Sequence, residues 1–302
     1  MMGEHSKVDG ELFQLEHHLS ADFGQTVSGL RQAEGGTDSK VYAARFNDQD
    51  VFIKMNDDEK LFPMQVELYR LLAEQGIFVP RILDVREQTS LGKPILIEAA
   101  MPGLPMSKLD ASKRGELMNE AGALLKRIHQ ITLPGYGWVE TSEGGLRGEH
   151  ESWGAFLVDG ESEIAQYLSE HGLISEDEKK ALHELWAELE TVPLSQGSLL
   201  HGDFQAEHIF TDGERITGVI DWGGARVGDP RYDIAVSGTF IDGSEWEDFK
   251  RGYGALADDP LVEAYGTMIA ARKLKLRHHA QRAEVSIAHV LNRLKVGLRQ
   301  RH

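Results

Sequence analysis

The chain contains no cysteine among its 302 residues. A protein without cysteine forms no disulfide, has no thiolate nucleophile and cannot bind zinc through sulfur. The sequence also lacks any run of about 18 apolar residues, the length that a membrane-spanning helix needs. Residues 1–20 have no continuous apolar core, which argues against a secretory signal. We therefore expect no membrane partner and a cytoplasmic location.

Basic residues are scarce relative to acidic ones. The chain has 32 Lys and Arg against 49 Asp and Glu, which gives a net charge of −17 at pH 7. Such a charge repels nucleic acid and attracts cations, so we expect no nucleic-acid partner. The hydrophobic fraction of 41% is ordinary for a globular protein. The length allows two lobes with separate cores. We expect the protein to be a monomer or a homodimer.

The first third of the chain is predicted to be β-rich. Short β-prone runs alternate with turn signals, and one helix interrupts them over residues 63–75. The helix is opened by a proline in its first turn and closed by a glycine. The predicted strands cover residues 26–33, 40–46, 51–55, 81–87 and 95–100.

The pattern changes at Met101-Pro102-Gly103, which we interpret as a hinge near residues 98–103. Beyond it, helical spacing dominates, and the only strands expected are short ones around an acidic pair. The fold class is therefore α+β, with a small β-rich N-terminal lobe over residues 1–100 and a larger, mostly helical lobe over 101–302. The predicted helices cover residues 112–131, 152–168, 175–191, 246–256, 261–279 and 285–298.

Two acidic residues at the ends of short apolar segments are the main chemical signal. His201-Gly202-Asp203 and Ile220-Asp221-Trp222 flank a predicted hairpin with Asp212-Gly213 at its turn. Phosphoryl transfer needs one carboxylate to accept a hydroxyl proton and another to bind the Mg²⁺ on the nucleotide phosphates. The spacing of the two acids suits that reaction.

The N-terminal lobe contains groups that a nucleotide needs. Gly35 to Ser39 lies between two predicted strands, where Gly36 and Ser39 can approach phosphates, although a Gly-Gly hairpin is more often only a turn. Lys54 lies within an apolar strand, and Glu67 lies on the helix that follows. This order of strand lysine and helix glutamate is the kinase arrangement that grips the α- and β-phosphates.

Together these motifs resemble the aminoglycoside phosphotransferase family of protein-kinase-like small-molecule kinases, nearest its hygromycin B phosphotransferase branch. The resemblance implies a bilobal kinase-like fold, ATP or GTP as donor, Mg²⁺ with Mn²⁺ as an alternative, and a hydroxyl acceptor. It implies an adenine-binding hinge along residues 96–103, which includes Glu98 and Ala100. It further implies that Asp203 is the base, Asp221 a metal ligand, Lys54 the phosphate clamp and Glu67 its orienting partner.

One position departs from the family pattern. His208 stands where the family usually has asparagine. An imidazole can bind a divalent cation, but Mg²⁺ prefers oxygen donors, so we expect His208 and Asp221 to form a metal site that tolerates Mn²⁺. His129 is interpreted as a core histidine with a satisfied partner. Asp229 and Asp233 are interpreted as structural acids that cap helices or pair with Arg226 or Arg231.

The acceptor is the open part of the prediction. The resemblance favours an aminoglycoside-like antibiotic, and the many acids between residues 140 and 190 could bind such a polycation. Solvated helix faces are the alternative explanation of those acids. A kinase of another small metabolite (a fructosamine, an amino alcohol or a macrolide) and a catalytically silent nucleotide-binding pseudokinase are the alternative functions.

Overall fold

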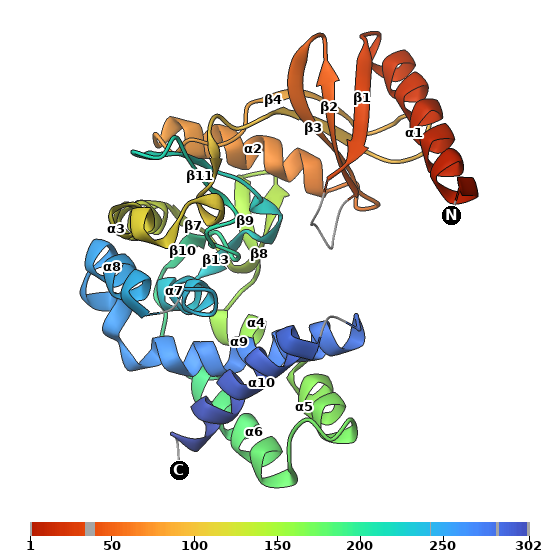
Figure 1. The fold of residues 1–302 in the computed structure, drawn as a ribbon. Helices are drawn as coiled ribbons and strands as arrows, with labels where there is room; N and C mark the ends of the chain where they lie inside the picture. The colour runs from red at the N-terminus through yellow and green to blue at the C-terminus, as the bar shows by residue number, and fades with distance from the viewer. Residues whose placement is uncertain (1, 34–39, 242, 282–283, 301–302) are drawn as a thin grey trace. The chain divides into compact units, whose positions relative to one another are not determined.

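The computed structural model describes residues 2–33, 40–241, 243–281 and 284–300 (Figure 1). The chain divides into two compact units. The first comprises residues 1–103 and 217–223, and the second comprises 104–216 and 224–302. A β-rich N-terminal part and a helical C-terminal part are thus confirmed. The linear division at residue 100 did not anticipate that residues 217–223 belong to the first unit.

The first unit is built on a five-stranded antiparallel sheet in the order β1-β2-β3-β5-β4. Apolar alternation explains its faces: in β3, Val51, Ile53 and Met55 are buried on one side, which places Lys54 on the other. All five strands were predicted from the sequence. Their bounds are β1 (Val27–Gln32), β2 (Lys40–Phe46), β3 (Gln49–Met55), β4 (Ile82–Arg86) and β5 (Ile95–Ala99).

Two helices accompany this sheet. The helix α2 (Leu61–Glu74) matches the predicted one, whereas α1 (Met2–Phe23) was not predicted. The C-terminal end of α1 packs on β1, and Leu19 and Phe23 join the core of the sheet. The Glu16 carboxylate also accepts a hydrogen bond of 2.6 Å from the backbone N–H of Leu30. Tertiary contacts therefore stabilise a helix that has a weak apolar stripe.

The second unit contains eight described helices, and several begin at capping side chains. Ser175 and Glu178 form a reciprocal capping box, and Asp229 and Asp259 cap helices that start with proline. The predicted helix over 152–168 is two helices, because the chain turns at Gly160 with a φ of +71°. The bounds are α3 (Ala111–Ile128), α4 (Trp153–Val158), α5 (Glu161–Glu170), α6 (Glu176–Glu190), α7 (Pro230–Gly238), α8 (Gly243–Tyr253), α9 (Pro260–His279) and α10 (Glu284–Arg299).

A five-stranded sheet in the second unit corrects the expectation that strands there would only flank the acidic pair. Its order is β7-β10-β13-β8-β9. Glycines permit close contact between its strands: a Cβ on Gly148 would lie 2.3 Å from the backbone N of Tyr136. The bounds are β7 (Thr132–Leu133), β8 (Tyr136–Ser142), β9 (Gly145–His150), β10 (Gly197–Leu200) and β13 (Arg226–Gly228).

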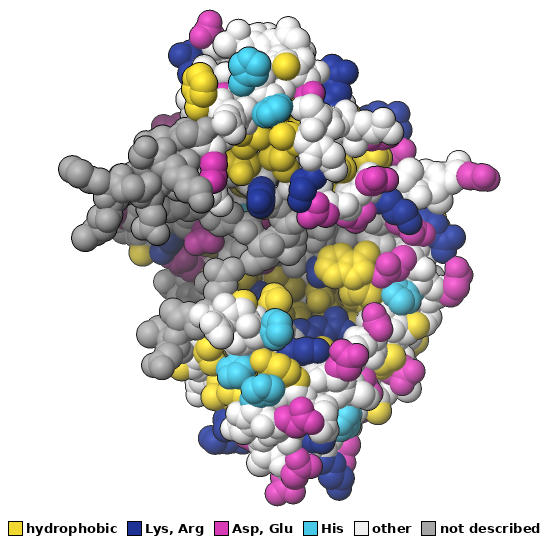
Figure 2. Space-filling model, turned by 90° about the vertical axis from the view of Figure 1, so that its right-hand side faces the viewer, with side chains coloured by type: hydrophobic (Ala, Val, Ile, Leu, Met, Phe, Trp, Pro, Cys, Tyr) yellow, Lys and Arg dark blue, Asp and Glu magenta, His cyan; other side chains and the backbone are white. Residues whose placement is uncertain are grey.

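A small three-stranded sheet and three short 3-10 turns complete the described elements. The sheet has the order β12-β11-β6, and a turn at residues 212–215 joins β11 to β12, as predicted. No helix of the described residues is long and apolar enough to cross a membrane. Acidic side chains are spread over the face drawn in Figure 2. The bounds are β6 (Leu104–Pro105), β11 (Ile209–Thr211), β12 (Ile216–Val219), η1 (Met106–Lys108), η2 (Trp222–Gly224) and η3 (Ala255–Asp258).

Candidate functional site

The loop after β10 carries the predicted base, Asp203, and is fixed by a buried carboxylate. The backbone N–H groups of His201 and Gly202 donate to Asp233 Oδ2 at 2.7 Å and to Oδ1 at 2.9 Å. His201 Nδ1 in turn accepts from the backbone N–H of Asp203 at 3.2 Å. Gly202 has a φ of +81°, and a Cβ there would lie 2.1 Å from the carbonyl oxygen of Gly224. The loop therefore needs glycine at this position, directly before Asp203.

Asp233 belongs to a buried hydrogen-bonded chain that reaches helix α3. Its Oδ2 lies 3.1 Å from Nε2 of His129, and Nδ1 of His129 lies 2.7 Å from the Tyr253 hydroxyl. Burial would raise the pKa of Asp233, but the hydrogen bond and charge of His129, with His201, outweigh it and lower that pKa. Burial and the Asp233 charge raise the pKa of Tyr253, so its hydroxyl stays protonated beside His129.

The structure agrees with the roles that the sequence predicted for His129, Asp229 and Asp233, and it adds a partner for Asp233. His129 is a core histidine with satisfied partners, and Asp233 is a structural acid, as predicted. Asp229 caps α7 and pairs with Arg231 at 2.7 Å, which was also predicted. What the sequence did not indicate is that Asp233 pairs with backbone N–H groups of the His201–Asp203 loop rather than with an arginine. It is a positioning residue for Asp203.

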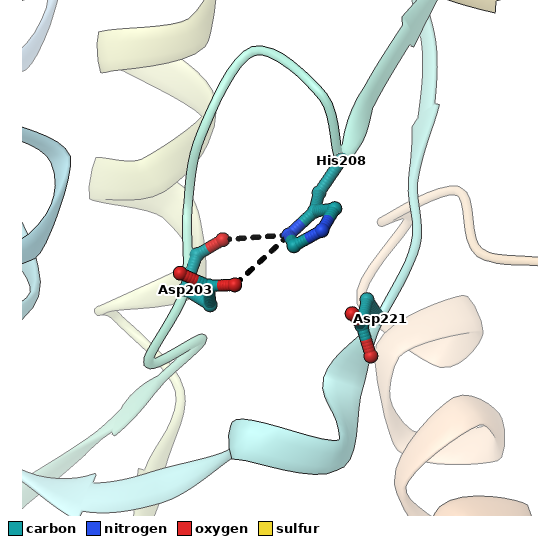
Figure 3. Close-up of side chains that lie close together, drawn as sticks. All are labelled: Asp203, His208 and Asp221. Atoms are coloured by element: carbon teal, nitrogen blue, oxygen red, sulfur yellow. Dashed lines mark hydrogen bonds and ion pairs between the residues drawn. The ribbon is translucent and has the colours of Figure 1, made fainter. Parts of the chain in front are cut away.

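Asp203 and His208 face each other across a short loop of the second unit (Figure 3). His208 Nδ1 lies 2.9 Å from the backbone oxygen of Asp203 and 3.5 Å from its Oδ2. Gln205 Nε2 donates to the same Oδ2 at 2.9 Å. The Asp203 side chain is 37% exposed, so an anchored carboxylate remains accessible to a ligand. With its proton on Nδ1, the imidazole of His208 has its lone pair on Nε2, the atom that can ligate a metal.

Asp221 lies in the first unit, two residues after β12, and is also labelled in Figure 3. It is exposed and has a φ of +65°, which is a costly conformation for a residue with a Cβ. The residues on either side are anchored: Val219 N donates to Phe78 O at 2.9 Å, and Trp222 Nε1 donates to Val219 O at 3.1 Å. The fold thus presents this carboxylate on a strained and fixed backbone.

Lys54 has a different partner from the one predicted. Its Nζ lies 2.7 Å from Glu98 Oε1, and the two side chains are 12% and 4% exposed. The pairing of β3 with β5 explains this contact, because Lys54 and Glu98 emerge on the same face of adjacent strands. The predicted pair of Lys54 with Glu67 is therefore wrong: Glu67 lies off the buried face of α2.

The buried polar residues of α2 are Gln65 and Tyr69, which the sequence analysis missed. Tyr69 donates to Glu98 Oε2 at 3.5 Å, and burial followed by the charges of Glu98 and Asp221 raises its pKa well above the ordinary value. Gln65 is 3% exposed, and its Oε1 has no hydrogen-bond partner among the described residues. Their spacing with Leu68 and Leu72 is the helical repeat that marks a buried face, and this signal could have found them.

Four further residues were predicted to contact the nucleotide, and the structure describes two of them, Glu98 and Ala100. Gly36 and Ser39 lie outside the described residues. Ala100 is half-buried after β5, and its backbone N–H donates to Asp50 O at 3.0 Å. Glu98, predicted as part of an adenine-binding hinge, directs its side chain to Lys54.

The acids between residues 140 and 190 are mostly exposed, as the alternative explanation predicted. Several already have local partners: Glu178 caps α6, Glu151 pairs with Arg147 at 3.0 Å, and Glu163 pairs with Lys275 at 3.5 Å. Burial raises the pKa of Glu161, which lies in the first turn of α5. Helix capping and local ion pairs thus account for these three acids.

Comparison with known proteins gives consistent matches. A model of the phosphotransferase enzyme family matches residues 29–274. Hygromycin-B 4-O-kinase of Escherichia coli is 24% identical over 264 residues, which are 82% of this chain and 74% of that protein. Homoserine kinase of Gluconobacter oxydans (strain 621H) is 27% identical over 225 residues, which are 71% of this chain and 66% of that protein.

A solved structure is similar over nearly the whole chain. It is a thermostable mutant of aminoglycoside phosphotransferase APH(4)-Ia in a ternary complex with ADP and hygromycin B. The TM-score is 0.75 at 22% sequence identity, and the match covers 94% of this chain and 97% of that one. This likeness confirms the predicted fold.

Proposed function

Because the chain belongs to the phosphotransferase enzyme family, we propose that it transfers the γ-phosphoryl group of ATP or GTP to a small-molecule hydroxyl, with Asp203 as the base. The observation that carries this proposal is the anchoring of the Asp203 loop. Asp233 holds the two preceding backbone N–H groups, while the Asp203 carboxylate itself stays 37% exposed. A fixed, accessible carboxylate can accept the hydroxyl proton as the phosphoryl group is transferred.

On the donor side, Lys54 is the proposed clamp for the α- and β-phosphates. Its ion pair with Glu98 holds the ammonium group in place in a nearly buried position. We also propose that the nucleotide phosphates lie near Gly36 and Ser39 and that the adenine lies near the backbone of Ala100. The ADP that the similar APH(4)-Ia complex holds supports an adenine nucleotide as donor.

We assign Asp221 and His208 to a divalent cation, Mg²⁺ with Mn²⁺ as the alternative. His208 directly precedes β11 and Asp221 closely follows β12, so the two residues flank one hairpin. The Asp221 carboxylate is the oxygen donor that Mg²⁺ prefers, and an imidazole nitrogen suits Mn²⁺. The hydrogen bond at Nδ1 of His208 orients its ring, as partners of metal-binding histidines do. When bound, the ion supplies charge neutralisation on the transferring phosphates.

Two acceptor classes are candidates. An aminoglycoside-like antibiotic is supported by the similarity to hygromycin-B 4-O-kinase. Another small metabolite is supported by the similarity to homoserine kinase and by basic side chains near Asp203 in the second unit. A pseudokinase is disfavoured because Lys54, Asp203 and Asp221 are all present.

The test is nucleotide consumption by wild type and Asp203→Asn over aminoglycosides, amino alcohols, hydroxy acids and sugar phosphates, with Mg²⁺ and with Mn²⁺. We expect acceptor-dependent consumption that falls by about 10²- to 10⁴-fold in the variant. Asp177→Asn, on the exposed first turn of α6, is the control. Equal rates for wild type and Asp203→Asn would exclude Asp203 as the base.

A further inference from the structure

Helix α9 places a lysine beside the Asp203 loop without a carboxylate partner. Lys273 Nζ lies 3.0 Å from the Thr239 hydroxyl and 3.7 Å from the centre of the Phe240 ring. Among the described residues, no carboxylate oxygen lies within ion-pair distance of it. Asp203 is the carboxylate whose charge acts on Lys273. This ammonium group is thus partly buried against a hydroxyl and a ring.

Strand β13 carries a second basic residue, Arg226, that also has no described carboxylate partner. The Nη1 atom of Arg226 donates to the carbonyl oxygen of Gly224 at 2.8 Å and to that of Gly202 at 3.4 Å. Gly202 directly precedes Asp203 in the chain. Its guanidinium lies 3.9 Å from the centre of the Trp138 ring. Its Nε is buried and has no hydrogen-bond partner among the residues that the structure describes. No described carboxylate forms an ion pair with Arg226 either.

Partly buried cations normally have anionic partners, because desolvating an unpaired charge is costly. This chain has 49 acids for 32 basic residues, yet it places none of the described acids in contact with Lys273 or Arg226. Arg277 and Arg293 add positive charge that acts on Lys273. The local potential therefore opposes the net charge of the protein and would repel a polycation.

We propose that Lys273 and Arg226 form a binding site for an anionic oxygen group, a carboxylate or a phosphate, on the same acceptor molecule whose hydroxyl faces Asp203. The site rests on the proposed kinase function and specifies its substrate class as a hydroxy acid or a sugar phosphate. Trp138, which is 43% exposed, supplies an apolar wall next to Arg226.

The protonation of Lys273 is consistent with such a ligand. Burial, followed by the charges of Arg277, Arg226 and Arg293, lowers its pKa to about 7, and the charge of Asp203 opposes this effect. A bound anion would stabilise the charged form and raise that pKa. Binding of the acceptor would then complete the ion pairing that the protein alone leaves open.

Direct binding tests the site without requiring turnover. Calorimetric titration of the full chain would use malate, inorganic phosphate and hygromycin B as probes, with wild type, Lys273→Gln and Lys275→Gln. Lys275 is a matched control because it lies on the same helix and pairs with Glu163. We expect Lys273→Gln to weaken binding of malate or phosphate by about 10- to 100-fold, as for a charge-assisted hydrogen bond. Lys275→Gln should match wild type, and hygromycin B binding should not weaken in Lys273→Gln.

Kinetics then separates the acceptor from the donor. Over hydroxy acids, sugar phosphates and aminoglycosides, we expect Lys273→Gln to raise KM for anionic acceptors while KM for ATP stays within about twofold. If KM rises for the hydroxy acids, the bound anion is a carboxylate; if it rises for the sugar phosphates, the anion is a phosphate. Lys273→Glu should further reduce use of anionic acceptors and leave aminoglycosides unaffected or improved.

Three results would overturn the site: preference of wild type for hygromycin B over every anionic acceptor, an equal effect of both lysine variants, or a change confined to KM for ATP. Failure of the kinase proposal looks different. Transfer that is unaffected by Asp203→Asn would reject the base, while anion binding that depends on Lys273 would still stand.

Discussion

His129 and Asp233 are joined by a hydrogen bond of 3.1 Å between Nε2 and Oδ2, and that same oxygen accepts the backbone N–H of His201 at 2.7 Å. The end of helix α3 is thus connected through one buried carboxylate to the loop that carries Asp203. A buried network of this kind is stabilising only when every member is satisfied. The relationship makes Asp233 the residue on which the geometry of the proposed base depends.

Replacing Asp233 tests this dependence. In Asp233→Asn, the amide NH₂ would face backbone N–H donors that now meet a carboxylate, so a buried donor is left unsatisfied. We expect the free energy of unfolding at pH 7 to fall by about 1–3 kcal/mol and kcat to fall with it. Urea denaturation and steady-state kinetics below the melting temperature measure the two effects.

The pH dependence gives this prediction a second readout. Since the pKa of Asp233 is lowered in the folded protein from its ordinary value of 3.8, its stabilisation is fully present above pH 3.8 and is lost as the pH falls through the folded-state pKa. The difference between wild type and Asp233→Asn should therefore shrink in acid. A constant difference from pH 7 to pH 3 would mean that the carboxylate charge is not what stabilises the loop.

The partner of Lys54 can be tested by comparing two glutamates. Glu98→Gln removes the charge that pairs with Lys54 at 2.7 Å, whereas Glu67→Gln changes a side chain off the buried face of α2. We expect Glu98→Gln to weaken ATP binding by about 10-fold, and Glu67→Gln to change it by less than about twofold. Calorimetric titration of ATP measures both. A larger effect of Glu67→Gln would show that Lys54 changes partner when nucleotide binds.

The position of His208 predicts a metal preference. In His208→Asn, an amide oxygen replaces the imidazole nitrogen as a ligand, and Mg²⁺ binds oxygen donors more readily. We expect activity to be retained, with the ratio of Mg²⁺-supported to Mn²⁺-supported rate rising several-fold. Titrating each metal against the rate of nucleotide consumption measures the ratio. Identical metal titrations for the two enzymes would remove His208 from the metal site.

Local sequence patterns predicted the parts of the fold that depend on neighbouring residues. The five strands of the first unit follow from apolar alternation, and Lys54 was recognisable because it interrupts such a strand. The loop with Asp203 was recognisable from residue types at close spacing. These features are properties of short segments, so one chain is enough to find them.

Features that depend on distant pairing were not predictable. The contact of Lys54 with Glu98 depends on the register of β3 against β5, which places Phe52 opposite Glu98. The sheet containing β8 and β9 was not predicted, and it depends on the close approach of two strands that Gly148 permits. Asp233 was expected to cap a helix or pair with an arginine, and only the folded chain brings it to the backbone of the His201–Asp203 loop. In each case tertiary contacts override the local signal.

The depressed pKa of Lys273 predicts a pH-dependent gain in stability when its charge is removed. Burial and three arginines lower that pKa from 10.5 to about 7, with Asp203 opposing them. Below pH 7, both the folded and the unfolded chain carry the charge, and the folded state bears the full cost. As the pH rises from 7 to 10.5, only the unfolded chain keeps the proton, so this cost declines to zero.

Lys273→Met should therefore stabilise the protein more at pH 6 than at pH 10. We expect the two changes in unfolding free energy to differ by at least about 1.4 kcal/mol, the equivalent of one pKa unit, which allows for partial solvent exposure. Urea denaturation of wild type and variant at both pH values measures this difference. Lys180→Met is the control, because that side chain is 79% exposed and should show no such pH dependence. If the effect of Lys273→Met is the same at both pH values, Lys273 is not a desolvated cation awaiting an anionic partner.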